Sequence, residues 1–194
     1  MAIILASKSP RRKELLEKIV EGFTVVESDF DEDSIEYEGD VSKYVTSLAV
    51  AKAKQISTKL NKPAIVIAAD TVVVLEDKIL EKPKTKKDAE CMLSALSGNN
   101  HKVYTGLCVI DTKTNNIVQE VAFTNVKFSK LTNNEIQEYI ETGSPMDKAG
   151  AYGIQDFGAV FVEKIEGCYY NVMGLPLNVL YKILKTMDFK GVNI

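Results

Sequence analysis

Residues 64–75 (AIVIAADTVVVL) constrain the fold most, because they are apolar and β-branched almost without interruption. Such a run is typical of a strand that is buried on both faces. Residues 76–78 predict a hairpin turn into a short strand over residues 79–80. Helical and strand patterns alternate along the rest of the chain, and several strand pairs look like hairpins. The sequence therefore favours a mixed α/β or α+β fold around a twisted sheet.

The other elements are predicted from apolar periodicity and from capping residues. Asp40 is a suitable N-cap for a long helix, and Thr132 with Glu135 forms a capping box. We expect further strands over residues 2–6, 23–26, 103–111, 117–128 and 159–165. We expect helices over residues 13–20, 41–60 and 176–187, one from the cap Thr85 to Gly98, and one from the cap Thr132 to Gly143.

The size of the chain, 194 residues, favours one domain over residues 1–194. A net charge of −3 argues against a general nucleic-acid binder, so any anion must meet local positive charge. Cys91, Cys108 and Cys168 form no CxxC pair, which is typical of a reducing compartment, and we expect Cys91 and Cys108 to act as small apolar residues. Without a signal-like start or a membrane-spanning run, we expect a soluble, cytoplasmic protein.

Asp70 interrupts the apolar run of residues 64–75. A carboxylate in a strand buried on both faces is costly unless it is paired, hydrogen-bonded or bound to a metal. That cost is most easily explained by a functional site at a strand end or a bulge. The alternative is an aspartate in a sharp turn between two strands.

The turn from the first strand into the first helix is polar and basic. Ser9 is a typical N-cap and Pro10 a typical first helical residue, which places Arg11 and Arg12 in the first turn. Cations there cost ~0.3–1 kcal/mol each unless an anion joins them. Backbone N–H groups, two guanidinium groups and the hydroxyls of Ser7 and Ser9 could bind a phosphate. The alternative is a solvated basic helix start, and the P-loop and dinucleotide-binding glycine motifs are both missing.

Lys52 lies within the apolar stripe of the predicted helix over residues 41–60, midway between Leu48 and Ile56. Lys54, two residues on, points elsewhere, towards water. A lysine on the inward face must extend its ammonium to the surface or meet a negative partner. The sequence leaves both possibilities open.

Acidic side chains are frequent after the second predicted strand, at Glu27, Asp29, Asp31, Glu32 and Asp33. Most of this run is expected to be a solvated loop. One member could join the carboxylate at position 70 in holding a divalent cation, because hard cations with phosphate substrates use one or two carboxylates. The residues alone do not identify that member.

Residues 147–155 (DKAGAYGIQ) set two glycines among small and aromatic residues, with Lys148 near the start and Gln155 at the end. This composition suits a loop in which a ligand approaches the backbone while Gln155 reads a hydrogen-bonding edge. A plain structural loop is the alternative. Lys82 adds another cation upstream. His101 lacks metal-ligand spacing and is more typical of a structural residue.

In this order the segments resemble the Maf family of nucleoside triphosphate pyrophosphatases. The resemblance runs through essentially the whole chain, and several motifs in one order are more specific than any one of them. It is carried by residues 5–12 (LASKSPRR), 31–32 (DE), 51–53 (AKA), 69–73 (ADTVV), 82–83 (KP), 96–98 (LSG), 101–106 (HKVYTG), 147–155 (DKAGAYGIQ) and 174–177 (GLPL). One departure is Asp156, where the family usually has a glycine, and it bears on loop conformation and slightly on base selectivity.

The resemblance implies a fold like that of the inosine triphosphatases, with an elongated, twisted mixed sheet, flanking helices and a cleft between two lobes. It implies attack of water on the α-phosphorus of a nucleoside triphosphate, with Mg²⁺ or Mn²⁺, giving a monophosphate and pyrophosphate. The sequence GIQ at residues 153–155 and Thr71 resemble the dTTP/UTP branch. The implied partner is a small nucleotide, with no nucleic acid or membrane, and a homodimer is expected.

The resemblance also assigns roles to single positions. Asp70 is the expected catalytic residue, as a base or as a metal ligand, and Glu32 is the second metal ligand. The expected substrate-binding residues are Ser7, Ser9, Arg11, Arg12, Lys52, Thr71, Lys82, Lys148 and Gln155. Within that set, the threonine and the glutamine are expected to face the base.

Two other functions stay open at this point. The first is a non-hydrolytic nucleotide-binding regulator of septum formation and cell division, because the family is associated with septum-formation arrest. Such a binder would need the cations but would have little need of a buried Asp70. The second is a house-cleaning pyrophosphatase for the purine nucleotides inosine triphosphate or 7-methyl-GTP.

Overall fold

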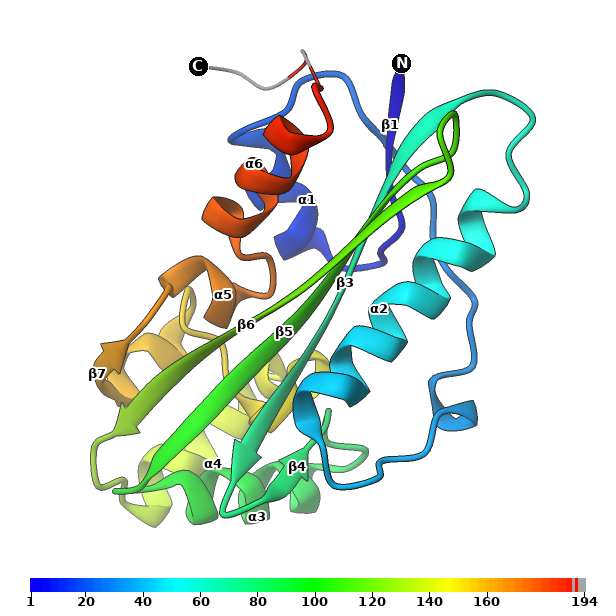
Figure 1. Cartoon of the computed structure of the whole chain (residues 1–194). Helices are drawn as coiled ribbons and strands as arrows, with labels where there is room; N and C mark the ends of the chain where they lie inside the picture. The colour runs from blue at the N-terminus through cyan, green and yellow to red at the C-terminus, as the bar shows by residue number, and fades with distance from the viewer. Residues whose placement is uncertain (190, 192–194) are drawn as a thin grey trace. The chain divides into compact units, whose positions relative to one another are not determined.

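The computed structural model describes residues 1–189 and 191 and has a mixed α/β fold (Figure 1). The strands are β1 (Ala2–Leu5), β2 (Thr24–Val25), β3 (Ala64–Leu75), β4 (Lys78–Leu80), β5 (Asn100–Asp111), β6 (Asn116–Phe128) and β7 (Val162–Glu166). The helices are α1 (Pro10–Glu17), α2 (Val41–Ser57), α3 (Lys86–Leu96), α4 (Asn133–Glu141), α5 (Tyr169–Met173) and α6 (Leu177–Thr186). Short 3₁₀ turns are η1 (Glu32–Ser34), η2 (Ser144–Asp147), η3 (Ala149–Ala151) and η4 (Phe157–Phe161). In this described part of the chain, no helix is long and apolar enough to cross a bilayer.

The strands of the described residues form one mixed sheet. Its order is β2-β1-β3-β5-β6-β7, and β4 pairs with β3 off this path. β1 is parallel to both neighbours, whereas the β3–β4 and β6–β7 pairs are antiparallel. Because β1 and β3 are internal and parallel, their side chains are buried on both faces, as the apolar run predicted.

Two compact units divide the chain. Unit 1 comprises residues 1–70, 105–122 and 174–194, and unit 2 comprises residues 71–104 and 123–173. β3, β5 and β6 each contribute residues to both units. The expected single domain over residues 1–194 and the cleft between two lobes stay predictions.

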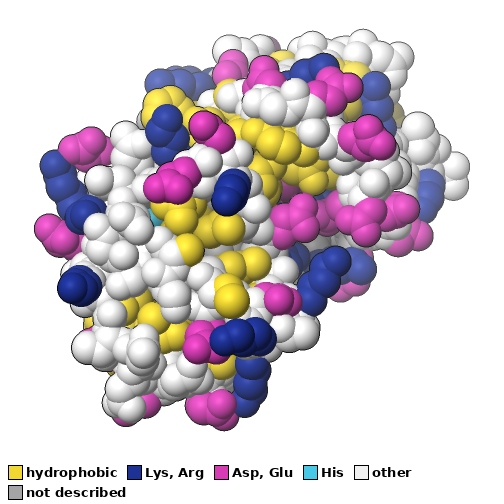
Figure 2. Space-filling model, turned by 90° about the horizontal axis from the view of Figure 1, so that it is seen from below, with side chains coloured by type: hydrophobic (Ala, Val, Ile, Leu, Met, Phe, Trp, Pro, Cys, Tyr) yellow, Lys and Arg dark blue, Asp and Glu magenta, His cyan; other side chains and the backbone are white. Residues whose placement is uncertain are grey.

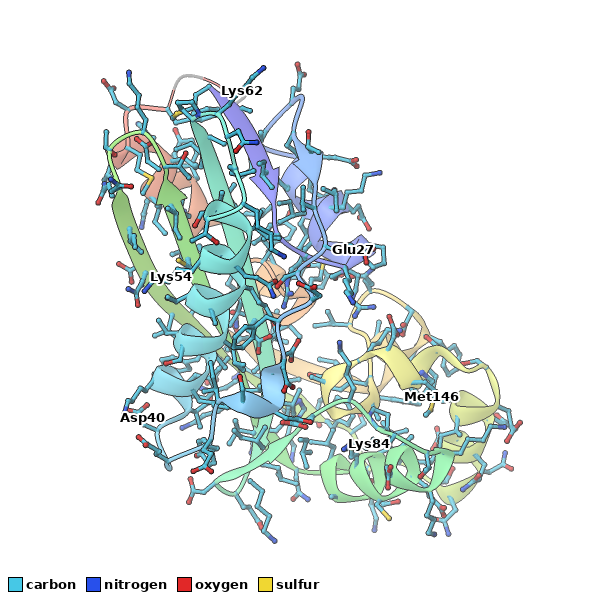
Figure 3. All side chains as sticks on the ribbon, turned by 90° about the vertical axis from the view of Figure 1, so that its right-hand side faces the viewer. Glu27, Asp40, Lys54, Lys62, Lys84 and Met146 are labelled. Carbon is cyan, nitrogen blue, oxygen red and sulfur yellow. The ribbon has the colours of Figure 1, made fainter. Side chains whose placement is uncertain are left out.

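The core of unit 1 lies between α2 and the sheet, and α1 and α6 lie on the other side of β1 (Figure 1). Small residues dominate the α2 side, so the helix approaches the strands closely. A Cβ atom at Gly106 would lie 2.3 Å from the carbonyl oxygen of Val45 in α2. The core residues are Ile4, Ala6, Ala49, Ala53, Ile56, Ala64, Val66, Ala68, Cys108 and Ile110. Asp40 caps α2, as predicted, and Lys54 is exposed on it (Figure 3).

Unit 2 is built from turns and capped helices around an aromatic core. Glu76 and Asp77 have φ values of 47° and 65°, which suit the tight turn of the predicted β3–β4 hairpin. Thr85 and Thr132 both form capping boxes, at α3 and α4. The aromatic core contains His101, Phe128, Tyr139, Tyr152 and Phe161.

Several predicted boundaries were wrong. α1 ends at Glu17 rather than at residue 20, because the N–H groups of Lys18 and Ile19 bond to carbonyls three residues back, as in a 3₁₀ turn. α2 ends at Ser57 instead of residue 60. The predicted strand over residues 159–165 begins as the 3₁₀ turn η4, and β7 starts only at residue 162. Cys108 is buried as expected, but Cys91 is exposed and is not a core residue.

Candidate functional site

Asp70 lies in the interior of β3 and faces α2. Side chains alternate along a strand, so Asp70 is on the same face as Val66 and Ala68, which pack in the α2 core. Lys52 of α2 meets it there: its Nζ donates to Asp70 Oδ1 at 2.5 Å. Asp70 is 6% exposed and Lys52 9% exposed. The alternative of an aspartate in a turn between strands is therefore wrong.

Glu32 brings a second carboxylate to the same ammonium. Lys52 Nζ lies 2.7 Å from Glu32 Oε1, so one lysine bridges the carboxylates of η1 and β3. The Glu32 side chain is 52% exposed, whereas that of Asp70 is 9% exposed. The lysine on the inward face of α2 thus meets negative partners instead of extending to the surface. Glu27, Asp29, Asp31 and Asp33 are exposed, as expected for a solvated loop.

Arg12 adds a second cation beside these carboxylates. Its Nε donates to Gly174 O at 2.8 Å, and its Nη1 donates to Ser7 Oγ at 3.4 Å. Burial lowers the pKa of Arg12 below its usual value, the charges of Asp70 and Glu32 oppose that shift, and Arg11 adds to it. The carbonyl bond fixes the guanidinium near the carboxylates from the start of α1.

Ser9 is the N-cap of α1, as predicted, with Pro10 as the first helical residue. Its Oγ accepts from Arg12 N at 3.4 Å. Ser7 Oγ accepts from Ser9 N at 3.1 Å, so both serines shape the turn between β1 and α1. Arg11 lies in the first turn of the same helix. This helix start therefore combines hydroxyls, N–H groups and guanidinium groups, the donor types that bind a phosphate.

We call Arg12, Glu32, Lys52 and Asp70 the Asp70 cluster; all lie in unit 1. Among residues 1–189 and 191, no group of three or more His, Cys, Asp or Glu side chains could hold a metal ion. The two carboxylates of the cluster still suit Mg²⁺, which is usually bound through one or two carboxylates together with substrate phosphates and water. The donor set fits a metal that is shared with a phosphate ligand.

Charges of both signs are mixed on the face of the molecule shown in Figure 2, and the basic side chains there do not merge into one surface. This agrees with the net charge of −3. In unit 1, Arg12 and Lys52 bring two buried or partly buried cations together at the Asp70 cluster. Such an arrangement suits a small anion better than a polymer.

Unit 2 holds the other predicted site residues. Gly150 N donates to Glu81 O at 3.1 Å, so the loop of residues 147–155 lies beside the backbone that precedes Lys82. A Cβ at Gly150 would lie 2.9 Å from the Val73 side chain, and Thr71 is on the same face of β3 as Val73. Lys82 and Gln155 are exposed and Thr71 is partly buried.

Lys148 is held inside the loop. Its Nζ donates to Ser144 O at 2.5 Å and to Asp147 Oδ1 at 2.7 Å, and it lies 3.2 Å from Asp156 Oδ2. Its side chain is 11% exposed. A bound phosphate would have to replace one of these partners. The role of Lys148 as a substrate contact stays a prediction.

The sequence marked Asp156 as a departure from the family pattern that bears on the loop, but it did not reveal what the side chain binds. Its carboxylate binds Tyr139, Ser144, Lys148 and the backbone of Gly158. We call these residues, together with Asp147, the Asp156 cluster. The pattern Asp-x-Gly is typical of an aspartate that caps a turn, and it was the available signal.

His101 has a structural partner that the sequence did not reveal. Its Nε2 lies 2.8 Å from Tyr152 Oη, and its ring packs edge-on against Phe128. Burial lowers the pKa of His101 to about 4, so the imidazole is neutral at physiological pH. These contacts agree with the expected structural role.

Comparison with known proteins identifies the family of this chain. The Maf-like protein family model matches residues 2–187. The dTTP/UTP pyrophosphatase of Clostridium perfringens strain SM101 is 61% identical over 188 residues, covering 97% of this chain and 98% of the relative. That of Clostridium novyi strain NT is 55% identical over 194 residues, covering 100% of both chains.

A solved structure of the Staphylococcus aureus Ham1 protein is similar in fold, with a TM-score of 0.52 at 15% identity. The likeness covers 96% of this chain and all of that one. It confirms the predicted mixed α/β fold class. The residues that match the family model include the Asp70 cluster and the loop of residues 147–155. This chain therefore belongs to the Maf-like protein family.

Proposed function

We propose that this protein hydrolyses dTTP and UTP to the nucleoside monophosphate and pyrophosphate, using a divalent cation such as Mg²⁺ or Mn²⁺. The observation that carries the proposal is the buried Asp70, bridged to Glu32 by Lys52. The relatives named dTTP/UTP pyrophosphatase, which match over the full chain, support the substrate class. From the family resemblance alone, we also propose a cytoplasmic homodimer.

The cations of unit 1 bind the triphosphate in this proposal. The Arg12 guanidinium is already fixed through Nε by Gly174 O, so little side-chain entropy is lost when its other N–H groups meet a phosphate. Arg11 and the hydroxyls of Ser7 and Ser9 contribute from the same turn. Lys52 transfers its ammonium from the carboxylates to a phosphate oxygen, which stabilises the charge of the leaving pyrophosphate.

Asp70 and Glu32 would hold the cation, which supplies neutralisation of charge on the phosphates. Once Lys52 has moved, the buried Asp70 carboxylate has an oxygen free to hold the attacking water or to take its proton. The geometry is compatible with either assignment, base or ligand.

The family resemblance assigns four more residues to the substrate. Lys82 and Lys148 are assigned to the phosphates, and Thr71 and Gln155 to the base. The Gln155 amide can accept a hydrogen bond from N3–H of uracil or thymine and donate one to O4. Its exposure leaves the amide accessible to a ligand.

The test is pyrophosphate release from dTTP, UTP, CTP, GTP, inosine triphosphate and 7-methyl-GTP, each with Mg²⁺ and with Mn²⁺. We expect dTTP and UTP to be the best substrates and the Asp70→Asn variant to lose activity. Binding of nucleotide without any pyrophosphate release would favour the regulator instead. Turnover of inosine triphosphate or 7-methyl-GTP at least about tenfold better than dTTP would favour the purine enzyme.

A further inference from the structure

The Asp156 carboxylate binds donors from separate parts of unit 2. Oδ1 accepts from Tyr139 Oη of α4 at 2.9 Å and from Gly158 N of η4 at 2.9 Å. Oδ2 accepts from Ser144 Oγ at 2.8 Å and lies 3.2 Å from Lys148 Nζ. One carboxylate thereby links α4, η2, the loop of residues 147–155 and η4.

The backbone around this carboxylate has little room to move. Tyr139 is fully buried, and its hydroxyl accepts from Gly153 N at 3.2 Å while it donates to Asp156. A Cβ at Gly153 would lie 2.5 Å from Asp156 Oδ2 and 2.6 Å from Lys148 Cε. Ala151 is held at a φ of 60°, a strained value for a residue with a Cβ. The segment is therefore fixed on both sides of Gln155.

The charges keep this arrangement intact at neutral pH. Burial alone would raise the pKa of Asp156, but the bonds from Gly158, Ser144, Tyr139 and Lys148 outweigh it and hold that pKa below its usual value. Burial raises the pKa of Tyr139, so its hydroxyl remains a donor. Asp156 therefore stays an ionised acceptor with its donors in place.

We propose that Asp156 is a positioning residue that sets base selectivity by fixing the backbone on both sides of Gln155. This inference rests on the proposed function. Uracil and thymine offer a donor at N3 and an acceptor at O4, whereas cytosine offers an acceptor and a donor at the corresponding positions. A glutamine amide held in one orientation distinguishes the two patterns, but an amide on a loose loop can turn over and match either.

The main experiment measures kcat and KM for dTTP, UTP and CTP in Asp156→Ala and Asp156→Asn. We expect Asp156→Ala to lower the UTP-to-CTP ratio of kcat/KM about tenfold, mainly through KM, with kcat changed less than about threefold. Asn keeps one oxygen acceptor but loses the other, so Asp156→Asn should lower the ratio by about threefold, less than Asp156→Ala does. The asparagine variant also tests the proposal if the alanine variant does not fold.

The matched control is Thr132→Ala, which removes the cap of α4 in the same unit. Its expected cost is about 1 kcal/mol of stability, and the substrate ratio should not change. An equal change of the ratio in Thr132→Ala would overturn the proposal, because general loosening of unit 2 would then explain the effect.

Hydrogen exchange separates this inference from the proposed function. The Gly153 and Gly158 amides should exchange faster in Asp156→Ala than in the wild type, because their acceptor network is lost. A wild-type protein without turnover would refute the proposed function, and with it the selectivity role, while exchange would still report whether Asp156 fixes the loop. An unchanged UTP-to-CTP ratio in an active alanine variant, or unchanged exchange, would refute the positioning role.

Discussion

The ammonium groups of Lys52 and Lys148 each contact two carboxylates, but these carboxylates differ in what else they bind. In the Asp70 cluster, Lys52 bridges Glu32 and Asp70, and the Arg12 guanidinium adds positive charge nearby. In the Asp156 cluster, Lys148 contacts Asp147 and Asp156. Asp156 also accepts bonds from a buried tyrosine, a serine and a backbone N–H.

This difference separates a reactive site from a structural one. Cations can be exchanged for another cation, so the carboxylates of the Asp70 cluster can pass from lysine to a metal or a water molecule. Uncharged donors, such as a buried tyrosine hydroxyl or a backbone N–H, cannot give up their acceptor without becoming unsatisfied buried polar groups. A carboxylate that is surrounded by such donors fixes a loop, whereas one whose partner is an exchangeable cation is available for chemistry.

The largest expected effect separates the two aspartates by activity. Asp70→Asn should lower kcat about 10³-fold, because the amide can neither take a proton nor bind a divalent cation well. Asp156→Asn should keep kcat within about threefold. Pyrophosphate release at saturating dTTP measures both, and thermal unfolding checks that both variants fold. A kcat of Asp70→Asn within tenfold of the wild-type kcat would contradict the proposed difference in role between the two aspartates.

The second effect concerns the packing behind each cluster. Gly106→Ala should lower the free energy of unfolding by about 3 kcal/mol, because its Cβ would meet the Val45 and Thr46 backbone at 2.3–2.7 Å. Gly153→Ala should cost about 2 kcal/mol, since its Cβ would displace side-chain atoms of Asp156 and Lys148, with the bonds they make, but no backbone. Urea unfolding measures both. Equal losses of unfolding free energy in the two variants would show that the loop of residues 147–155 is packed as rigidly as the contact between α2 and β5.

The sequence singled out Asp70 and Lys52, each by itself, because burial and charge conflict at both positions. A carboxylate inside residues 64–75 and a lysine inside an apolar helical stripe must both be explained, and each explains the other. The choice of Glu32 from its acidic run came only from family resemblance. Its neighbours in that exposed run are acidic too, so composition could not single it out.

The Asp156 cluster was not predictable in the same way. Most of its members lie in turns, where apolar periodicity gives no signal. Its buried donor Tyr139 lies in α4, where the sequence pattern of a core residue gives no sign of a hydrogen bond. The fold shows the same pattern. The helices α2, α3 and α4 begin where their caps predict. Part of η4 was predicted to be a strand, because its residues are apolar and the capping role of Asp156 was not recognised.

A smaller effect is expected from pH. The pKa of His101 in unit 2 is about 4 in the folded protein, against about 6.5 when unfolded. Between these values the unfolded chain binds more protons, so stability falls as the pH falls from about 6.5 towards 4. The loss from this group is about 2 kcal/mol at pH 5. His101→Gln should flatten the pH dependence of urea unfolding, and an unchanged slope would argue against a buried neutral imidazole.

The smallest effect tests whether the cations of the two clusters are exchangeable. Lys52→Gln should tighten Mn²⁺ binding without nucleotide about tenfold, because the ammonium and the metal compete for the same oxygens of Glu32 and Asp70. Electron paramagnetic resonance of free Mn²⁺ measures this affinity directly and needs no turnover. The same competition implies that in the wild type the metal binds better with a nucleotide, whose phosphates draw Lys52 away.

Lys148→Gln is the matched control, because it also removes an ammonium between two carboxylates. It should not create Mn²⁺ affinity, since Asp156 keeps its bonds from Tyr139, Ser144 and Gly158 and has no oxygen to spare. Equal gains in the two variants would mean that lysine removal alone attracts the metal. No gain in Lys52→Gln would place the cation away from Glu32 and Asp70, and the exchange of cations at the Asp70 cluster would have to be abandoned.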